Sequence, residues 1–144
     1  MSKKIVLVTG GFDPIHSGHI AYFNEAKSLG DFLVVGINSD PWLIRKKGKP
    51  FMPFQERESV ISNLRMVDLV IKFDDDDGSA IDAIRVVRKM FTTQTIIFAN
   101  GGDRTKSNIP EMSFKDNDLI FEFGVGGEDK KNSSSWILKE WENR

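Results

Sequence analysis

The sequence of 144 residues contains no cysteine, so disulfide bonds and thiolate metal sites are excluded. This absence fits a reducing compartment, and we expect the protein in the cytoplasm. Long apolar runs are also missing. The first apolar run, residues 5–8 (IVLV), is far too short for a signal peptide or a membrane span. We therefore expect no membrane attachment.

An excess of charge of one sign is missing as well. Lysine and arginine total 20, aspartate and glutamate total 21, and the formal net charge is −1. The general electrostatic attraction toward nucleic acids is therefore weak, and we expect no nucleic-acid partner. An anionic ligand must instead be held by local placement of donors. The length and the ordinary apolar content predict one domain, residues 1–144.

The sequence does contain a regular alternation of apolar runs and helical patterns. A short β-branched run closed by glycines is typical of a strand buried on both faces. Gly30 stands where a helix-ending glycine belongs, and the proline-rich segment 38–53 predicts a long loop that can hold a short helix. The predicted strands are residues 5–8, 32–37, 69–71, 95–99 and 119–123, and the predicted helices are residues 17–29, 54–66, 79–90 and 133–141.

This alternation predicts an α/β protein with a Rossmann-like, three-layer α/β/α fold and a five-stranded, mainly parallel sheet. Ligands of such sheets bind beyond the carboxyl ends of the strands, where the strand order reverses. The loops that follow predicted strands are therefore the candidate site: residues 10–19, 38–53, 100–111 and 125–135.

The loop at residues 10–19 carries the most informative residues. It contains neither the G-x-G-x-x-G of dinucleotide-binding folds nor a Walker A lysine, which argues against a dinucleotide-dependent oxidoreductase. Instead, His16 and His19 lie three residues apart at the start of a predicted helix, so both can face one ligand. The free N–H groups of a first helical turn favour an anion there, and Gly18 lets a phosphate approach the backbone.

Two other interpretations of the histidines are open. His16 and His19 can be loop residues whose hydrogen bonds are satisfied within the protein, or they can bind a transition metal together with Asp13. No third strong metal ligand is evident in the sequence. We therefore favour the phosphate interpretation.

Two charge runs need interpretation. The basic run at residues 45–49 is either a solvated loop or a phosphate clamp, and its place next to the predicted site favours the clamp. The acidic run at residues 74–77 predicts a solvated turn without a catalytic role, before a helix capped near Ser79. Trp42, in the same loop as the basic run, is a candidate to stack on the acceptor or to close the site.

The run GFDPIHSGH, residues 11–19, resembles the HxGH signature of the cytidylyltransferase-like nucleotidyltransferase superfamily. The resemblance extends over most of the chain and is nearest to glycerol-3-phosphate cytidylyltransferases and heptose-1-phosphate adenylyltransferases. It is carried by LGDFLVVGINSD (29–40), QER (55–57), MVDLVI (66–71), a GGD as in the heptose-phosphate enzymes (101–103) and an SSS as in pantetheine-phosphate adenylyltransferases (133–135).

The resemblance implies a nucleotidyltransferase that moves CMP or AMP from CTP or ATP to a phosphorylated small molecule, with release of pyrophosphate. The acceptor is then a polyol, alcohol or sugar phosphate. Mg²⁺ enters with the triphosphate, without a metal site on the protein, and related enzymes are often homodimers. The implied catalytic residues are His16, His19 and Lys46, with Lys47 and Lys49 able to replace Lys46. The implied nucleotide-binding residues are Thr9, Gly10, Gly11, Phe12, Asp13, Gly18, Arg57, Gly102, Asp103, Arg104, Ser133, Ser134 and Ser135.

One departure from the family pattern concerns the substrate. Glycerol-phosphate cytidylyltransferases carry R-T-x-G-I-S-T-T before the last helix, whereas this chain reads EDKKNSSS at residues 128–135. The arginine is missing, and Lys130 and Lys131 are the candidates to replace it. The choice between CTP and ATP stays open, as does the acceptor. A nucleotide-binding module without turnover is the alternative, but the intact His16 and His19 argue against it.

Overall fold

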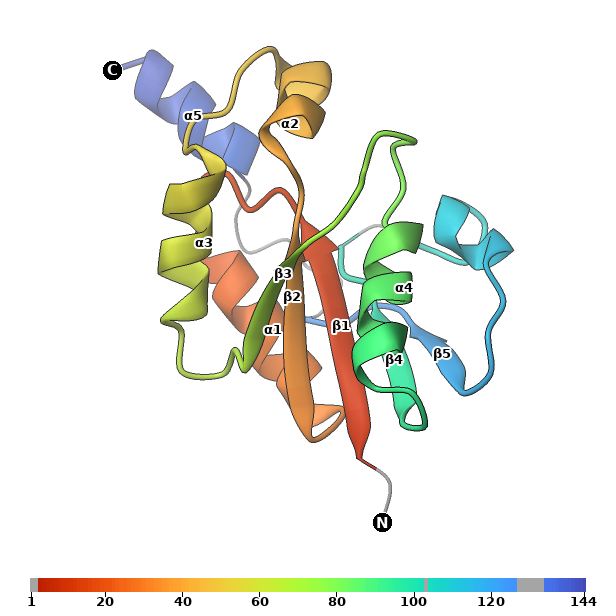
Figure 1. Ribbon diagram of the computed structural model, residues 1–144. Coiled ribbons are helices and arrows are strands. Elements are labelled where there is room, and N and C mark those ends of the chain that lie inside the picture. The colour runs from red at the N-terminus through yellow and green to blue at the C-terminus, as the bar shows by residue number, and fades with distance from the viewer. Residues whose placement is uncertain (1–2, 103, 127–133) are drawn as a thin grey trace.

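The computed structural model describes residues 3–102, 104–126 and 134–144. Its centre is a parallel sheet of five strands in the order β3-β2-β1-β4-β5, with helices on both faces (Figure 1). This confirms the predicted Rossmann-like, three-layer fold. The strands are β1 (Lys4–Gly10), β2 (Phe32–Ile37), β3 (Leu69–Lys72), β4 (Thr95–Ala99) and β5 (Leu119–Glu122), and the helices are α1 (Ser17–Ser28), α2 (Asp40–Lys47), α3 (Phe54–Ser62), α4 (Ile81–Met90), the 3₁₀ turn η1 (Pro110–Ser113) and α5 (Ser134–Glu142).

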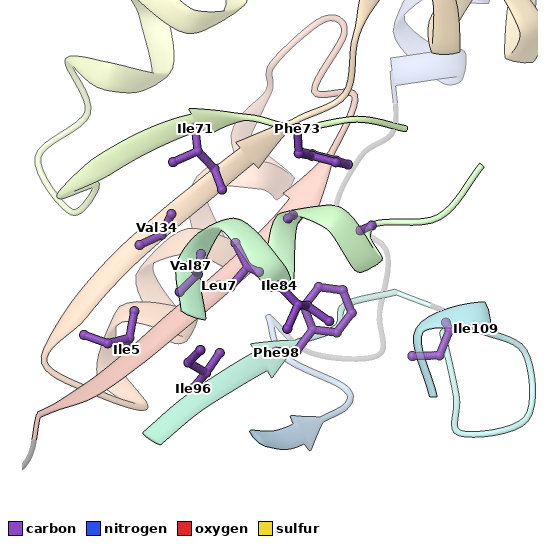
Figure 2. Close-up of a cluster of buried hydrophobic side chains, with 12 residues drawn as sticks. Ile5, Leu7, Val34, Ile71, Phe73, Ile84, Val87, Ile96, Phe98 and Ile109 are labelled. Atoms are coloured by element: carbon purple, nitrogen blue, oxygen red, sulfur yellow. The ribbon is translucent and has the colours of Figure 1, made fainter. Parts of the chain in front are cut away.

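Strand β1 shows why the sheet is central. Its successive side chains point to opposite faces, and five in a row are buried because both faces are covered. Ile5 and Leu7 pack in the cluster that includes Ile84 and Val87 of α4 (Figure 2). Val6 and Val8 pack in a second cluster on the opposite face of the sheet. That cluster includes Phe23 and Ala26 of α1, Ile61 of α3 and the β2 residues Leu33, Val35 and Ile37.

The segment 38–53 contains a short helix, as the sequence allowed. This helix, α2, has two turns, and the Ser39 hydroxyl caps its first turn by accepting a hydrogen bond from the Trp42 N–H at 3.2 Å. Two other element boundaries differ from the predicted ones. Helix α3 ends at Ser62 rather than at 66, because the chain turns there to bring Asp68 to the Leu33 N–H at 2.8 Å. Helix α4 begins at Ile81, two residues after the predicted cap.

Gly30 follows the end of α1, as predicted. A glycine is needed at this position because the chain packs closely against the start of β1. A Cβ at this position would lie 2.7 Å from the carbonyl oxygen of Lys4, which is inside van der Waals contact. The Asp31 N–H donates to the same oxygen at 2.9 Å. Gly30 therefore lets the chain leaving α1 pass directly over the start of β1.

The strand order reverses between β1 and β4. The loops after these two strands therefore run to different layers and leave an opening at the carboxyl edge of the sheet. The loop after β1 leads into α1 on one face, and the loop after β4 leads to η1, whose Met112 packs with the α4-side cluster on the other face (Figure 1). In the described part of the chain, no helix has the length and apolar character needed to cross a membrane.

Candidate active site

An open cavity of about 1280 Å³ lies at this edge. Its walls come from the loops after β1, β2, β3 and β4, from α2 and from both ends of α5. Most of the residues expected at the site line it: Thr9, Gly10, Gly11, Phe12, Asp13, His16, Gly18, His19, Lys46, Gly102, Arg104, Ser134 and Ser135. Asp103 and Ser133 lie outside the described residues, and Arg57 occupies a different place, described below.

The two histidines form the start of α1. His16 is the residue before the helix, and its Nδ1 accepts a hydrogen bond from the Gly18 N–H at 3.0 Å. The reciprocal hydrogen bond comes from His19, three residues later, whose Nδ1 accepts from the His16 N–H at 3.2 Å. This is the geometry of a capping box, built from two imidazoles. The rings stack with centroids 3.8 Å apart and planes at 24°.

These contacts decide where the protons of the histidines lie. An imidazole nitrogen that accepts a hydrogen bond carries no proton, so each neutral ring has its proton on Nε2. Burial is the largest cause that lowers the pKa of His19, followed by the charges of His16 and Lys46, and the pKa falls to about 3. At neutral pH, His19 is therefore an uncharged donor at the wall of the cavity.

Phe12 packs against the His19 ring. Its side chain is buried, and its ring meets His19 edge-on at 5.1 Å and Phe23 of α1 at 5.0 Å between centroids. The backbone of Phe12 has φ of 50°, in the left-handed region that a bulky residue rarely adopts. The packing of this ring therefore fixes the turn between β1 and α1.

Asp13 connects this turn to the basic loop. Its buried carboxylate accepts hydrogen bonds from the N–H groups of Phe51 and Met52 and pairs with Lys47 Nζ at 2.8 Å. Lys47 Nζ also donates to the Asp13 carbonyl oxygen at 2.7 Å. Lys47 is thus held by Asp13, whereas Lys46 Nζ lies 4.9 Å above the Trp42 ring at the cavity wall. Of these two lysines, Lys46 is the one with its charge near His19.

Asp75 shows that the solvated-turn prediction for residues 74–77 is wrong at this position. Its carboxylate is buried and accepts hydrogen bonds from the Asn38 side chain at 3.0 Å and from the Ser39 N–H and hydroxyl at 2.8 and 2.7 Å. Burial by itself raises the pKa of Asp75, but the hydrogen bonds from Ser39 and Asn38 and the charge of Arg45 outweigh it and lower the pKa. Asp75 therefore fixes the junction between β2 and α2.

Arg57 lies behind the cavity wall rather than in the cavity. Its side chain is fully buried, and its guanidinium donates to the carbonyl oxygens of Gly11 at 2.9 Å, Asn38 at 2.7 Å and Met52 at 2.9 Å. The remaining nitrogen pairs with Asp40 Oδ1 at 2.6 Å. A guanidinium in this position ties the site loops together and does not reach a phosphate in the cavity. Its role in this structure is to hold the loops that bear the ligand-facing groups.

The start of α5 supplies a second row of donors near α1. The Ser134 hydroxyl donates to the Pro14 carbonyl oxygen at 2.8 Å, which attaches α5 to the loop before α1. Ser134 and Ser135 both line the cavity. On the β4 side, Tyr22 packs against Gly101 and Gly126, where any Cβ would come within 3.1 Å of the tyrosine. Because glycine has no side chain, Gly101 and Gly126 border this part of the cavity with backbone atoms.

Sequence reasoning missed several lining residues. Tyr22 lies on α1 at helical spacing from His19, a local signal that could have found it. Asn38 and Glu111 gave no such signal, because their place depends on partners far along the chain. Among the described residues, no group of three or more His, Asp or Glu side chains could hold a metal ion.

Replacing Arg57 tests its role as the connection among the loops. Arg57→Leu removes the hydrogen bonds to three carbonyl oxygens and the ion pair with Asp40, and we expect a loss of about 2 to 4 kcal/mol in the free energy of unfolding. Urea unfolding measures this loss. Arg65→Leu, at an exposed position of the same chain, is the matched control and should cost less than about 0.5 kcal/mol. Equal losses in the two variants would contradict the structural role.

The lowered pKa of His19 predicts a pH dependence of stability. An unfolded histidine binds a proton near pH 6.5, but folded His19 does so only near pH 3. The stabilisation is therefore complete above pH 6.5 and is lost as the pH falls toward 3. We expect the free energy of unfolding to drop by about 1 to 2 kcal/mol between pH 7 and pH 5.

The His19→Gln variant is the control for this titration, because glutamine does not titrate. Its unfolding free energy should change less between pH 7 and pH 5 than that of the wild type. Asp68 and Asp75 lose their contributions only below the ordinary aspartate pKa of 3.8, so they do not interfere in this range. Parallel profiles for the two proteins would show that the pKa of His19 is not lowered.

Comparison with known proteins places this geometry in a family. The cytidylyltransferase-like family model matches residues 7–123. The bifunctional protein HldE of Helicobacter pylori is 33% identical over 126 residues, which are 86% of this chain and 26% of that protein. HldE of Hahella chejuensis is 38% identical over 109 residues, which are 74% of this chain and 21% of that protein. The chain thus spans about a quarter or less of the length of these relatives.

Solved structures agree with the fold. The lipopolysaccharide core biosynthesis protein from Thermoplasma volcanium superposes with a TM-score of 0.64 at 25% identity, covering 90% of this chain and 99% of that one. A bifunctional NMN adenylyltransferase/ADP ribose pyrophosphatase from Francisella tularensis, in complex with AMP and a manganese ion, gives a TM-score of 0.69 at 17% identity, covering 100% and 43%. The paired histidines at the start of α1, the reversed strand order beside them and the match over residues 7–123 lead to one conclusion: this chain belongs to the cytidylyltransferase-like family and is a nucleotidyltransferase.

Proposed function

We propose that the chain transfers an adenylyl group from ATP to the phosphate of a small phosphorylated molecule, a sugar phosphate or polyol phosphate. The observation that carries the proposal is the capping box of His16 and His19. It occupies the Nδ1 atoms of both rings, so that neutral His19 has its proton on Nε2 at the wall of the cavity. An imidazole N–H beside the first N–H groups of a helix forms a site for a phosphoryl group.

The reaction needs little from the protein beyond positioning. An oxygen of the acceptor phosphate attacks the α-phosphorus of ATP in line, a new P–O bond forms, and the bond to the bridging oxygen of pyrophosphate breaks. The attacking oxygen is already anionic, so no general base is required. The protein has to hold the two groups in line and stabilise the negative charge on the oxygens of the α-phosphate.

His19 is suited to that stabilising role because it is neutral. A lowered pKa keeps its Nε2–H as a fixed dipole, and the Phe12 ring and the stacked His16 ring hold its orientation. A donor that is already oriented costs no reorganisation when charge develops on the phosphate. His16 supplies the second donor from the adjacent position.

Lys46 and the start of α5 are the groups for the departing pyrophosphate. The Lys46 ammonium stands at the cavity wall, and Ser134 and Ser135 begin a nine-residue helix beside the His16 turn. The cation, the serine hydroxyls and the helix N-terminus all favour anions. Mg²⁺ enters as part of the nucleotide substrate and neutralises charge on its phosphates.

Two sequence features favour ATP over CTP. The GGD at residues 101–103 resembles that of heptose-1-phosphate adenylyltransferases, and the arginine that glycerol-phosphate cytidylyltransferases carry before the last helix is missing. The fold also accommodates AMP in the Francisella tularensis protein. Gly101 and Gly102, the two glycines of this GGD, line the cavity at the end of β4.

Pyrophosphate release is the experiment that tests the proposal. ATP, CTP, GTP and UTP with Mg²⁺ are each combined with glycerol 3-phosphate, mannose 1-phosphate and ribose 5-phosphate, and thermal unfolding reports nucleotide binding in parallel. We expect release with ATP and at least one acceptor. Release with CTP alone would replace adenylyl by cytidylyl transfer. Nucleotide binding without release from any pair would contradict catalysis and favour a binding module.

His19→Ala tests the catalytic role of the imidazole. Removing a donor to the charge that develops on the α-phosphate should lower kcat by at least about a hundredfold. ATP should still raise the unfolding temperature of the variant, because the other phosphate-binding groups remain. His19→Gln, whose amide can donate, should lose less than His19→Ala. A kcat within about threefold of wild type in His19→Ala would remove His19 from the mechanism.

A further inference from the structure

Glu111 is a buried carboxylate that the mechanism above does not use. It lies on η1, its side chain is only 1% exposed, and it lines the cavity. One oxygen, Oε2, accepts a hydrogen bond from the Ala80 N–H at 2.6 Å. The other oxygen, Oε1, has no hydrogen-bond partner among the described residues.

An unpaired buried carboxylate oxygen is costly to maintain. A buried acceptor without a partner costs about 1 to 3 kcal/mol, and more when it is charged. The side chain is nonetheless held firmly in place. Ile109, two residues earlier, packs in the α4-side cluster with Ala80, whose N–H holds Oε2 (Figure 2). The arrangement keeps one oxygen on the protein and leaves the other, buried in the cavity lining, without a hydrogen bond.

The position of Glu111 separates it from the phosphate-binding groups. His16, His19 and the start of α5 belong to the α1 side of the sheet. Glu111 lies at the start of α4, on the opposite face, together with the cavity-lining residues Gly78, Ser79 and Ala80. The cavity therefore has two parts, one rich in phosphate donors and one bordered by a carboxylate with an unpaired oxygen.

The carboxylate of Glu111 disfavours a phosphate in the α4-side part of the cavity. A carboxylate repels phosphate oxygens, and its free lone pairs accept hydrogen bonds from O–H or N–H groups. With the triphosphate on the α1 side, the α4-side part is the space into which the organic portion of the acceptor extends when its phosphate attacks in line. The hydroxyl groups of that portion are the matching donors.

We propose that Glu111 is a specificity-determining residue for the acceptor: its Oε1 accepts a hydrogen bond from a hydroxyl group of the phosphorylated acceptor, in the part of the cavity at the start of α4. The inference rests on the proposed function, because it takes the acceptor to be a phosphorylated alcohol or sugar. It adds that a hydroxyl other than the phosphorylated one is required for tight binding. A site built to pair with a hydroxyl discriminates strongly against a ligand that lacks it.

Matched pairs of acceptors test this requirement without turnover. Glycerol 3-phosphate is paired with propyl phosphate, and mannose 1-phosphate with cyclohexyl phosphate, so that each pair differs in its hydroxyl groups. Affinity is measured by calorimetry in the presence of a non-hydrolysable ATP analogue and Mg²⁺. Wild type should bind the hydroxylated member of at least one pair at least about tenfold more tightly, as expected for a hydrogen bond to a charged group.

Glu111→Gln is the matched variant. The glutamine side chain has the same shape, and its amide oxygen can still accept from the Ala80 N–H, but the group facing the cavity is a neutral amide. Glu111→Gln should weaken binding of the hydroxylated ligand about tenfold and leave the affinity for its partner and for the ATP analogue within about twofold. Glu122→Gln, at an exposed position on β5, is the control for the change in charge and should bind like wild type.

Four results would overturn the inference. Wild type binds both members of every pair equally or binds none of them; Glu111→Gln keeps the wild-type preference, so that Glu111 only holds α4; or the variant loses affinity for the ATP analogue instead. The wild-type comparison stands by itself if Glu111→Gln fails to fold. Because pyrophosphate release is measured separately, active wild type without hydroxyl discrimination would reject the role of Glu111 and leave the proposed transferase activity intact.

Discussion

The site depends above all on the buried guanidinium of Arg57. A charged group that is 0% exposed has to find partners for all its donors, and Arg57 finds them in Gly11, Asn38, Met52 and Asp40. These residues belong to the loop after β1, the end of β2, the segment before α3 and the first turn of α2. One side chain thus holds every loop on the α2 side of the cavity at a fixed distance from the others. If one of these loops moved away, the buried guanidinium would lose a hydrogen-bond partner. The loops are therefore held in place together.

The histidine pair shows how a structural contact and a chemical function use different atoms of the same ring. The Nδ1 atoms cap α1, a task that Ser, Thr or Asp commonly performs with an oxygen. An imidazole caps with one nitrogen and keeps an N–H on the other side of the ring, directed away from the helix. The cap therefore orients the donors, and the buried setting that lowers the pKa of His19 keeps that ring neutral.

The distribution of charge shows how the proposed triphosphate site is compatible with a formal net charge of −1. The attraction is local. Lys46 and the N-termini of α1 and α5 lie along one side of the cavity, while the acidic side chains near the site are bound to partners: Asp13 to Lys47 and two backbone N–H groups, Asp75 to Asn38 and Ser39. Glu111 is a buried lining carboxylate with one oxygen unpaired, and it lies on the other face of the sheet. The polarity of the cavity therefore changes from one layer of the fold to the other.

The sequence by itself determined the layers of the fold and the centre of the site. The continuous apolar run of β1 and the helical spacing within α1 and α4 are local patterns, because residues two apart on a strand, or three to four apart on a helix, share a face whatever the topology. The pairing of His16 with His19 is equally local, since three residues separate them. Most other lining residues that were expected lie in the loops that follow strands, which a parallel sheet brings to one edge.

Tertiary structure alone decided which charged residues face the cavity. Arg57 was expected beside the triphosphate but turns inward to Gly11, 46 residues away, and Asp75 was expected in a solvated turn but binds Asn38, 37 residues away. Glu111 meets Ala80 across 31 residues. Each of these contacts depends on the strand order and on where each loop begins at the edge of the sheet. Local sequence patterns do not encode either of these. A charged side chain in a loop looks the same in sequence whether it faces solvent, a ligand or the protein interior, and only the packed fold supplies the partners that distinguish the three.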